Sequence, residues 1–553
     1  MSTVNMPSLK SLINIFNKYP ALKYFLIFEL AFLLFSYLQL DPSFPDPDSF
    51  YHTKIALLIK EQGIVKNFPY FQATVLKDYF IDHHFLYHLL LVPFIIILPP
   101  LYGVKFATII FAGLTITAFY WLLSQLKIKG AFFYSLILIV TDPFIFRINL
   151  AKAQAIALII FFISIYLIVH RRYNYLFILS FLYVWLYGGW PLILVLSCLY
   201  VFVNAIFESV KKIKFSRKKF LSCVTRYTLH VTRQVFFKHN LKLLASAFGG
   251  VVLGLIINPY FPKNLFFYWQ QIFQIAVINY KDIINVGGEW YPYNPVDLVA
   301  NASLAFIVFI VAATFFALNI KKQNILSVVL LILTAFFIIL TIRSRRNVEY
   351  LIPVSLLFSA FSLDVFLKSA DLKNFWRELK EFLAEQKILI IFFIAPLIAI
   401  PYITYKDISS VKRSFIGISF DKFRPAMQYL ADNSNLGDIV FHSDWDESPI
   451  LFYHNSKNYY LVGLDPTFMY KYSQELYSKW ERITTGKESK NLAETAKSDF
   501  SARFVFISLD RHENMAKIFS SAPGFERIYQ DKEAVIYQVT PSIIPGNDQK
   551  QPR

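Results

Sequence analysis

Charged residues are scarce in this sequence, at 17% of its 553 residues, whereas a soluble protein of this length carries roughly a quarter. Because the shortage is concentrated in repeated apolar runs, it excludes an ordinary soluble protein. A small-residue cleavage site is missing around the first run, which excludes a removable signal peptide and favours a retained signal anchor. Cysteine is nearly absent. Cys198 falls in an apolar run and Cys223 in a basic loop, so the soluble C-terminal part has no disulfides.

Hydrophobic side chains are abundant, at 56% of the chain. They gather in runs of about 17–20 residues, the length that a helix needs to cross a hydrocarbon core of ~30 Å. A further apolar run at 84–101 is interrupted by three prolines, and for it we predict a helix in the outer interface. We predict about eleven membrane-spanning helices, at residues 22–40, 104–123, 130–142, 152–169, 175–189, 191–207, 242–258, 301–319, 325–341, 347–367 and 387–405.

The formal net charge of +18 is distributed around the ends of these spans. Residues 211–242, between the sixth and seventh spans, carry ten Lys and Arg and no acid. Because cytoplasmic loops are enriched in Lys and Arg, this bias fixes the orientation. We predict a multi-pass plasma-membrane protein with a cytoplasmic N-terminus and an extracytoplasmic C-terminal domain. The basicity therefore reflects topology. Membrane lipids are expected as partners, and no nucleic acid is.

The predicted fold class is a polytopic α-helical membrane protein with a C-terminal extracytoplasmic α/β domain. Residues 1–405 form the transmembrane domain, with long outer loops at 41–103 and 259–300. The tail at 541–553 is polar and contains Pro and Gly, which favours disorder. In the C-terminal domain, at 420–540, we predict a helix at 425–433 and strands at 439–441, 459–462, 504–509, 525–529 and 534–539.

The first outer loop carries two carboxylates one residue apart, Asp46 and Asp48. Such a pair, held by prolines, suits a divalent cation, Mg²⁺ or Mn²⁺, that also holds phosphate oxygens. The alternative is that Asp48 or Ser49 only caps the following helix, predicted for 50–62 and ended by Gly63.

The same loop ends in Asp82, His83 and His84. A cluster of one acid and two histidines is a signal for a metal site, and we predict that the two histidines are further metal ligands. Polar residues on an ordinary surface are the alternative.

Basic residues at the outer ends of spans oppose the orientation bias and therefore need a reason. Arg147 and Lys152 follow the third span, and Arg343 and Arg346 lie between the ninth and tenth. Arginine suits bidentate phosphate binding, so we predict that the three arginines hold a phosphate group. The alternatives are snorkelling to the interface after the third span and a miscounted span before the tenth.

Two further loops supply candidate residues. In the second outer loop, Glu289 lies among glycines and aromatic rings, as in a sugar-facing loop, and an interfacial aromatic belt is the alternative. The C-terminal domain places Asp444, Trp445, Asp446 and Glu447 shortly after a strand. Ligands of α/β modules usually bind at such a strand end, and a polar surface turn is the alternative.

Several segments, in order along nearly the whole chain, resemble the GT-C superfamily, most closely the catalytic subunit of oligosaccharyltransferases. Asp46-Pro47-Asp48-Ser49-Phe50-Tyr51 resembles the Asp-Pro-x-x-x-Tyr pattern of the family's first outer loop. Arg147 matches an arginine after the third span, and residues 185–191 are similar to an aromatic turn. Residues 343–350 resemble a lipid-phosphate-binding region, and 427–446 resemble the stretch that ends in the W-W-D-Y-G motif.

The resemblance implies a glycosyltransferase that moves a sugar or oligosaccharide from a lipid-linked donor, a polyprenyl phosphate or pyrophosphate, to a protein or glycan acceptor. Asp46 and Asp48 would act on the cation or the acceptor, with Asp82 and Glu289 as helpers, and residues 444–447 would bind the acceptor. The sequence departs from the family at three places. The family's Thr-Ile-x-Glu loop is absent, and Glu289 is the only stand-in for its acid. Gln154 stands where the family has a metal-binding aspartate, and Asp444 and Glu447-Ser448 replace residues of the acceptor motif.

Three alternatives stay open at this point: an oligosaccharyltransferase with a diverged acceptor pocket, a transporter, and a non-catalytic membrane protein descended from such an enzyme. Transporters usually carry charged residues near the bilayer midplane, whereas Glu29 is the only acid deep within a predicted span. Gln154 keeps the non-catalytic alternative open.

Overall fold

The computed structural model describes residues 18–215, 240–278, 280–369, 374, 377–378, 380–381 and 391–540. Most of the basic segment that indicates the orientation, with Cys223, and the tail at 541–553 lie outside these residues. Within the described residues, five helices are long and apolar enough to cross a membrane. They are α2 (Pro20–Leu38), α6 (Pro100–Gln125), α11 (Pro191–Phe215), α17 (Ile325–Arg343) and α18 (Val348–Ser369).

Two apolar segments are broken by sharp bends. Helices α7 (Ala131–Ile139) and α8 (Asp142–Ile148) meet at 78°, and α15 (Pro295–Asn301) and α16 (Ser303–Leu318) meet at 96°. If each pair is one span, the described residues hold up to seven. Shorter apolar helices are α5 (Phe85–Ile97), α9 (Gln154–Val169), α10 (Tyr173–Leu186) and α13 (Leu241–Ile256), and α20 (Ile391–Ser414) precedes the C-terminal domain. The chain is thus a membrane protein, and the eleven spans stay a prediction.

The bend after α7 shortens the span predicted at 130–142. Pro143 lies in the first turn of α8, a position that proline fits but from which it cannot continue the hydrogen bonds of a preceding helix. The chain therefore turns, and α8 carries Arg147 to a buried position.

Glycines allow α10 and α13 to pack closely. A Cβ atom on Gly254 would lie 2.8 Å from the carbonyl oxygen of Phe181, nearer than two such atoms can approach. Small residues at such contacts are the usual way in which membrane helices come together.

The first outer loop contains α3 (Asp48–Gln62) and α4 (Leu76–Tyr79). Helix α3 ends at Gly63, as predicted, and this residue has a φ of +76°, which glycine adopts without strain. The remaining short helices are α14 (Lys263–Trp269), η2 (Gln270–Ile278), η3 (Tyr280–Asp282), η4 (Gly288–Trp290), η5 (Ile320–Lys322) and η6 (Arg345–Asn347).

The C-terminal region folds as a five-stranded sheet with helices around it, which agrees with the predicted strands. The strand order is β4-β3-β5-β7-β6, parallel among the first three strands and antiparallel among the last three. The strands are β3 (Ile439–His442), β4 (Tyr459–Tyr460), β5 (Ala502–Ser508), β6 (Phe525–Gln530) and β7 (Ala534–Val539). The helices are α21 (Arg424–Asp432), α22 (Ser448–His454), α23 (Thr467–Tyr472), α24 (Gln474–Thr484), α25 (Leu492–Ser498) and α26 (Glu513–Ser521).

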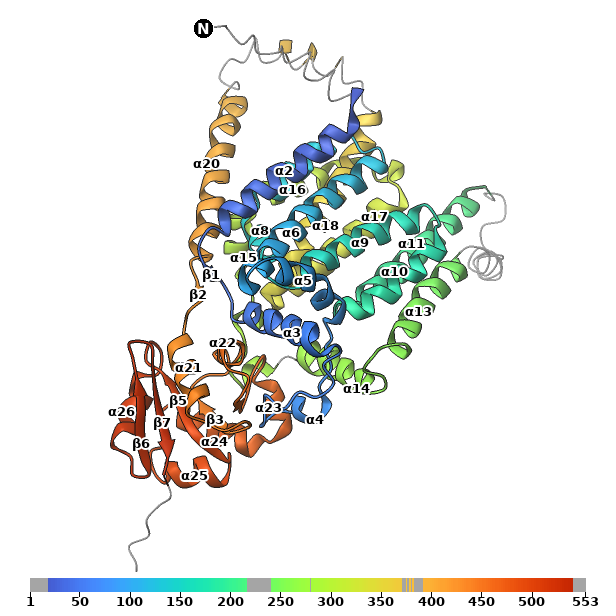
Figure 1. The fold of residues 1–553 in the computed structure, drawn as a ribbon. Helices are drawn as coiled ribbons and strands as arrows, with labels where there is room; N and C mark the ends of the chain where they lie inside the picture. Colours follow the sequence, from blue (N-terminus) through green and yellow to red (C-terminus); the bar gives the residue numbers. More distant parts are fainter. Residues whose placement is uncertain are drawn as a thin grey trace, which may run out of the picture.

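The first outer loop joins this sheet to the membrane helices (Figure 1). Strand β1 (Ser43–Phe44) pairs with β2 (Ile418–Ser419). Further along the loop, the backbone N–H groups of Gln72 and Ala73 donate to the carbonyls of Tyr460 and Leu461 at 2.7 and 2.9 Å. Backbone bonds of this kind continue the sheet beyond β4. The start of α3 is thereby held against the C-terminal domain.

Candidate functional site

A cavity of about 940 Å³ opens where the membrane helices meet the C-terminal domain. Its walls come from the first outer loop, the segment after α7, the second outer loop, the turn between α17 and α18, the end of α20 and the C-terminal domain. The charged side chains in these walls are Asp46, Asp48, Asp142, Arg147, Lys152, Glu289, Asp297, Arg345, Asp444, Asp446, Asp465 and Arg511. Most of the candidates predicted from distant parts of the sequence therefore line one cavity.

Asp46 and Asp48 have different partners, although a single residue separates them. Asp46 Oδ1 accepts hydrogen bonds from the backbone N–H of Ser49 at 3.0 Å and from its hydroxyl at 3.1 Å. Asp46 therefore caps the first turn of α3, a role that the sequence had offered to Asp48 or Ser49. The Asp48 carboxylate faces Lys152 instead, and its Oδ2 lies 2.7 Å from Nζ. Burial raises the pKa of Asp46, while Lys152 opposes this shift and Asp48 adds to it.

Glu289 lies beside two arginines. Its Oε2 is 2.7 Å from Arg147 Nη1, and its Oε1 is 3.6 Å from Arg346 Nη1. Burial alone would raise the pKa of Glu289, but Lys152, Arg346 and Arg147 hold it well below its usual range. A carboxylate with so low a pKa is a poor proton acceptor at neutral pH. Glu289 is therefore suited to stay negatively charged and to orient Arg147 and Arg346.

The sequence prediction missed Glu349, which completes this cluster. Its Oε2 lies 2.9 Å from Arg147 Nη2 and accepts a hydrogen bond from Arg147 Nε at 3.0 Å. Both side chains are buried, and a buried arginine needs such paired carboxylates. The sequence held a partial signal, because Glu349 is an acid in the first turn of a mostly apolar helix and stands three residues after Arg346.

The arginines between α17 and α18 occupy different environments. The Arg346 guanidinium stacks 4.3 Å above the ring of Trp290, and its Nη2 donates to the Tyr187 hydroxyl at 3.3 Å. Arg345 lines the cavity. Arg343 is exposed at the end of α17, and neither Arg343 nor Arg346 is part of the cavity wall. Arg346 instead packs behind Trp290 and Glu289, which do line the cavity. Of the two arginines predicted here to hold phosphate, Arg346 alone lies beside Glu289.

Asp82 belongs to a separate buried chain of polar groups. Its Oδ2 lies 2.7 Å from His88 Nδ1, and His88 Nε2 lies 2.7 Å from His52 Nδ1. Asp82 is not part of the cavity wall. The structure therefore assigns it a partner in α5 and does not bring it to the other predicted catalytic residues.

The structure does not gather the predicted metal ligands, Asp46, Asp48, His83 and His84, into one set. The His84 ring stacks on Tyr187 with centroids 5.7 Å apart, and the His83 ring lies 5.1 Å from that of Phe267. Over the described part of the chain, no three His, Cys, Asp or Glu side chains are grouped so that they could hold a metal ion. The aromatic neighbours of the two histidines come from distant segments, so the local sequence could not reveal them, and the role of the histidines as metal ligands stays a prediction.

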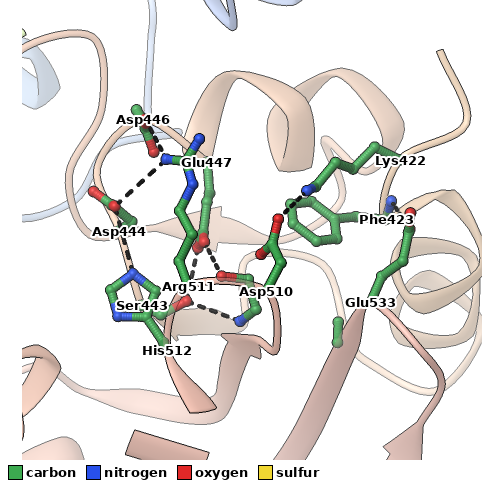
Figure 2. Close-up of polar contacts among 12 residues, drawn as sticks. Lys422, Phe423, Ser443, Asp444, Asp446, Glu447, Asp510, Arg511, His512 and Glu533 are labelled. Carbon is green, nitrogen blue, oxygen red and sulfur yellow. Dashed lines mark hydrogen bonds and ion pairs between the residues drawn. The ribbon is translucent and has the colours of Figure 1, made fainter. Parts of the chain in front are cut away.

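The C-terminal domain contributes Asp444, Trp445 and Asp446 to the cavity wall. Figure 2 shows Asp444 between Arg511 and His512, at 3.9 and 3.4 Å, and Asp446 Oδ2 lies 2.7 Å from Arg511 Nη1. Sequence analysis missed Arg511, which follows β5, because no local pattern distinguishes it from other surface arginines.

Glu447 faces the interior of the domain instead of the cavity. Its carboxylate accepts hydrogen bonds from the hydroxyls of Ser443, at 2.7 Å, and Ser508 (Figure 2). Burial, with a smaller contribution from Asp444, raises the pKa of Glu447 to about 7. The predicted acceptor-binding segment thus divides into cavity residues at 444–446 and a buried carboxyl group.

This raised pKa predicts a pH-dependent stability. Because the folded state binds the Glu447 proton more tightly than the unfolded state, its stabilising effect is complete below the ordinary pKa of 4.5 and is lost as the pH rises through about 7. We expect Glu447→Gln to keep the neutral hydrogen bonds and to flatten the fall of the thermal midpoint between pH 5 and 8. Unfolding would be followed by tryptophan fluorescence. Glu526→Gln, on an exposed part of β6, is the control, and equal slopes in wild type and Glu447→Gln would contradict the assignment.

No family model matches this sequence, and no curated protein matches it. The fold does have solved relatives. The chain is similar to the archaeal oligosaccharyltransferase AglB from Archaeoglobus fulgidus, in complex with an inhibitory peptide and a dolichol-phosphate, with a TM-score of 0.61 and 16% identity over 96% of this chain and 75% of that chain. It is also similar to ArnT from Cupriavidus metallidurans bound to undecaprenyl phosphate, with a TM-score of 0.52 and 12% identity over 93% of this chain and 97% of that chain. The chain therefore has a GT-C-like fold.

Proposed function

We propose that the protein is a glycosyltransferase that moves a sugar from a polyprenyl-phosphate-linked donor to an acceptor on the outer face of the membrane. The observation that carries this proposal is one cavity in which Asp48, Arg147, Lys152 and Glu289 face Trp445 and the other residues of the C-terminal wall. The GT-C-like fold supports it, because AglB and ArnT are described with polyprenyl-type lipid phosphates bound.

The reaction breaks the bond between the sugar's anomeric carbon and the phosphate oxygen, and forms a bond from that carbon to the acceptor. The acceptor loses a proton and the lipid phosphate leaves as an anion. Asp48 would take the proton, because its carboxylate lies in the cavity and Asp46 supplies the helix cap. Glu289 is less suited, since its pKa is held low.

Arg346 would hold the departing phosphate. Its planar guanidinium is oriented by Trp290, Tyr187 and Glu289, and a preoriented arginine can bind phosphate oxygens in a bidentate way. Arg147 is already engaged by two carboxylates, so its contribution would be to hold Glu289 in place.

The acceptor would enter from the C-terminal side, past Trp445 and Asp446. Trp445 reaches the second outer loop, since a Cβ atom on Gly287 would lie 3.5 Å from its ring. An aromatic ring beside a carboxylate suits a sugar or a peptide hydroxyl. The acceptor class is therefore left as a glycan or a protein.

The test is sugar transfer by purified protein. Radiolabelled polyprenyl-phosphate sugars would be offered with membrane glycans and with a peptide that carries an Asn-x-Thr acceptor. We expect label on one acceptor class and release of the free lipid phosphate. If neither transfer nor donor hydrolysis occurs with any donor, the enzyme proposal fails and the non-catalytic alternative stands.

Labelling of the peptide in the same test would favour the oligosaccharyltransferase alternative. The similarity to AglB, which is described with an inhibitory peptide, is the reason for offering a peptide acceptor in the test. Uptake of substrate without bond cleavage would indicate a transporter.

The orientation belongs to the proposal as well. In a background without Cys198 and Cys223, we expect a cysteine at Lys322 to react with an impermeant maleimide only from the cytoplasm, and one at Ser520 only from outside. Both positions are exposed. If both cysteines react from the same side of the membrane, the predicted placement of the C-terminal domain outside the cytoplasm is contradicted.

A further inference from the structure

The cavity contains a largely buried lysine that sequence analysis did not assign to the site. Lys152 lies in the turn between α8 and α9, and its side chain is 11% exposed. Its Nζ is 2.7 Å from Asp48 Oδ2 and 4.0 Å from Asp46 Oδ2. The ammonium group therefore stands between the two carboxylates for which a divalent cation was predicted.

The side chains around Lys152 do not fit a divalent cation. Asp46 Oδ1 is engaged at the cap of α3, and Gln154 offers a neutral amide. Mg²⁺ can be held by one or two carboxylates together with waters and substrate phosphates, but here the Lys152 ammonium already contacts Asp48 Oδ2. Asp46 Oδ2 and Gln154 Oε1 are buried and accept no hydrogen bond. Asp46 Oδ2 is the one charged oxygen of these two, and it lies 4.0 Å from Lys152 Nζ, which repels a second cation there. No group of three ligating side chains exists within the described ranges.

A lysine ammonium could do part of what a divalent cation does in such a site. It is a compact positive charge that can neutralise an anionic leaving group and orient a carboxylate. It cannot act as a Lewis acid with several coordination positions. A contact of 2.7 Å to Asp48 also leaves no room for a second cation on that oxygen, because like charges repel.

We propose that Lys152 takes the place of a divalent cation, so that this site positions Asp48 and neutralises the donor phosphate without a metal ion. The proposal rests on the proposed function for the phosphate, whereas the arrangement of Lys152 and Asp48 stands without it. Lys152 would contact the donor through Nζ and would be a catalytic residue.

The first test measures metal binding and needs no activity. Mn²⁺ added to purified wild-type protein would be followed by electron paramagnetic resonance. We expect the amount bound to be the same in wild type and in Asp48→Asn. The double change Lys152→Ala with Gln154→Asp should create an additional Mn²⁺ site, which Asp48→Asn should then remove. Binding to wild type that Asp48→Asn abolishes would overturn the proposal.

The second test uses sugar transfer. We expect wild-type transfer to be equal in EDTA and in millimolar Mg²⁺, and Lys152→Gln to lower it by ~10²-fold. Lys152→Arg should keep more activity than Lys152→Gln because the charge remains, and a thermal midpoint for each variant separates lost chemistry from lost folding. Loss of wild-type transfer in EDTA would overturn the proposal. If wild type transfers no sugar under any condition, the proposed function fails, and the Mn²⁺ measurement still decides the role of Lys152.

Discussion

Asp48→Asn is expected to lower sugar transfer by ~10²- to 10⁴-fold, the range typical for loss of a general base. Asparagine has the same shape and can stay beside Lys152, but it cannot accept the acceptor's proton. The initial rate of transfer from a radiolabelled donor measures the effect, and donor binding should change much less than turnover.

Asp41 offers a matched control for Asp48 in the same loop. It is also paired with a lysine, because its Oδ2 lies 2.5 Å from Lys412 Nζ, but it is not part of the cavity wall. We expect Asp41→Asn to leave turnover unchanged. Full activity of Asp48→Asn would contradict the assignment of Asp48 as the proton acceptor, and the catalytic base would then lie outside the first outer loop.

Asp46→Asn tests whether Asp46 only caps α3 while Asp48 accepts the proton. Since asparagine caps a helix about as well as aspartate, the start of α3 should keep its geometry. A large loss of turnover in this variant would then mean that the Asp46 charge takes part in the reaction.

Arg346→Gln is expected to weaken donor binding by roughly ten- to a hundredfold, because one charge-assisted contact contributes about 1.5–3 kcal/mol. Arg346→Lys should retain part of the affinity, since lysine keeps the charge but loses the planar fork and the stacking on Trp290. The concentration of free polyprenyl phosphate that halves binding of a labelled donor measures these differences.

Arg343 is the natural comparison, three residues away and exposed. We expect Arg343→Gln to bind donor as wild type does. If Arg343→Gln and Arg346→Gln lose affinity equally, a diffuse positive field would explain donor binding better than a defined phosphate site. If neither loses affinity, the assignment of Arg346 falls.

The sequence predicted those parts of the fold that depend on local patterns. The strands at 439–442, 502–508, 525–530 and 534–539 follow from short apolar runs between turn residues. The end of α3 at Gly63 follows from the preference of helix ends for glycine. The bend after α7 was missed, since apolar periodicity continues across a turn and Pro143 alone does not give its angle.

The sequence indicated several of the carboxylates and arginines of the candidate site, but it did not indicate which of them contact one another. Whether Asp46 or Asp48 caps α3 depends on side-chain rotamers, which the pattern does not contain. Whether Asp48 meets a metal ion or Lys152 depends on how two segments about a hundred residues apart fold back on each other. Arg511 and Glu349 needed the same long-range information, because each completes a cluster whose other members lie elsewhere in the chain.

The first outer loop pairs with a segment near the end of the chain, so this contact cannot form until most of the chain has been synthesised. The hydroxyl of Ser43 donates to the carbonyl of Phe415, 372 residues later. At roughly 5–20 residues per second, the ribosome needs on the order of 20–70 s to make the intervening chain. During that time the apolar helices after Ser43 are made, while the C-terminal wall of the cavity does not yet exist. A chain that ends before Asp444 therefore lacks the cavity wall that Asp444, Trp445 and Asp446 form, and on the proposed function it would transfer no sugar.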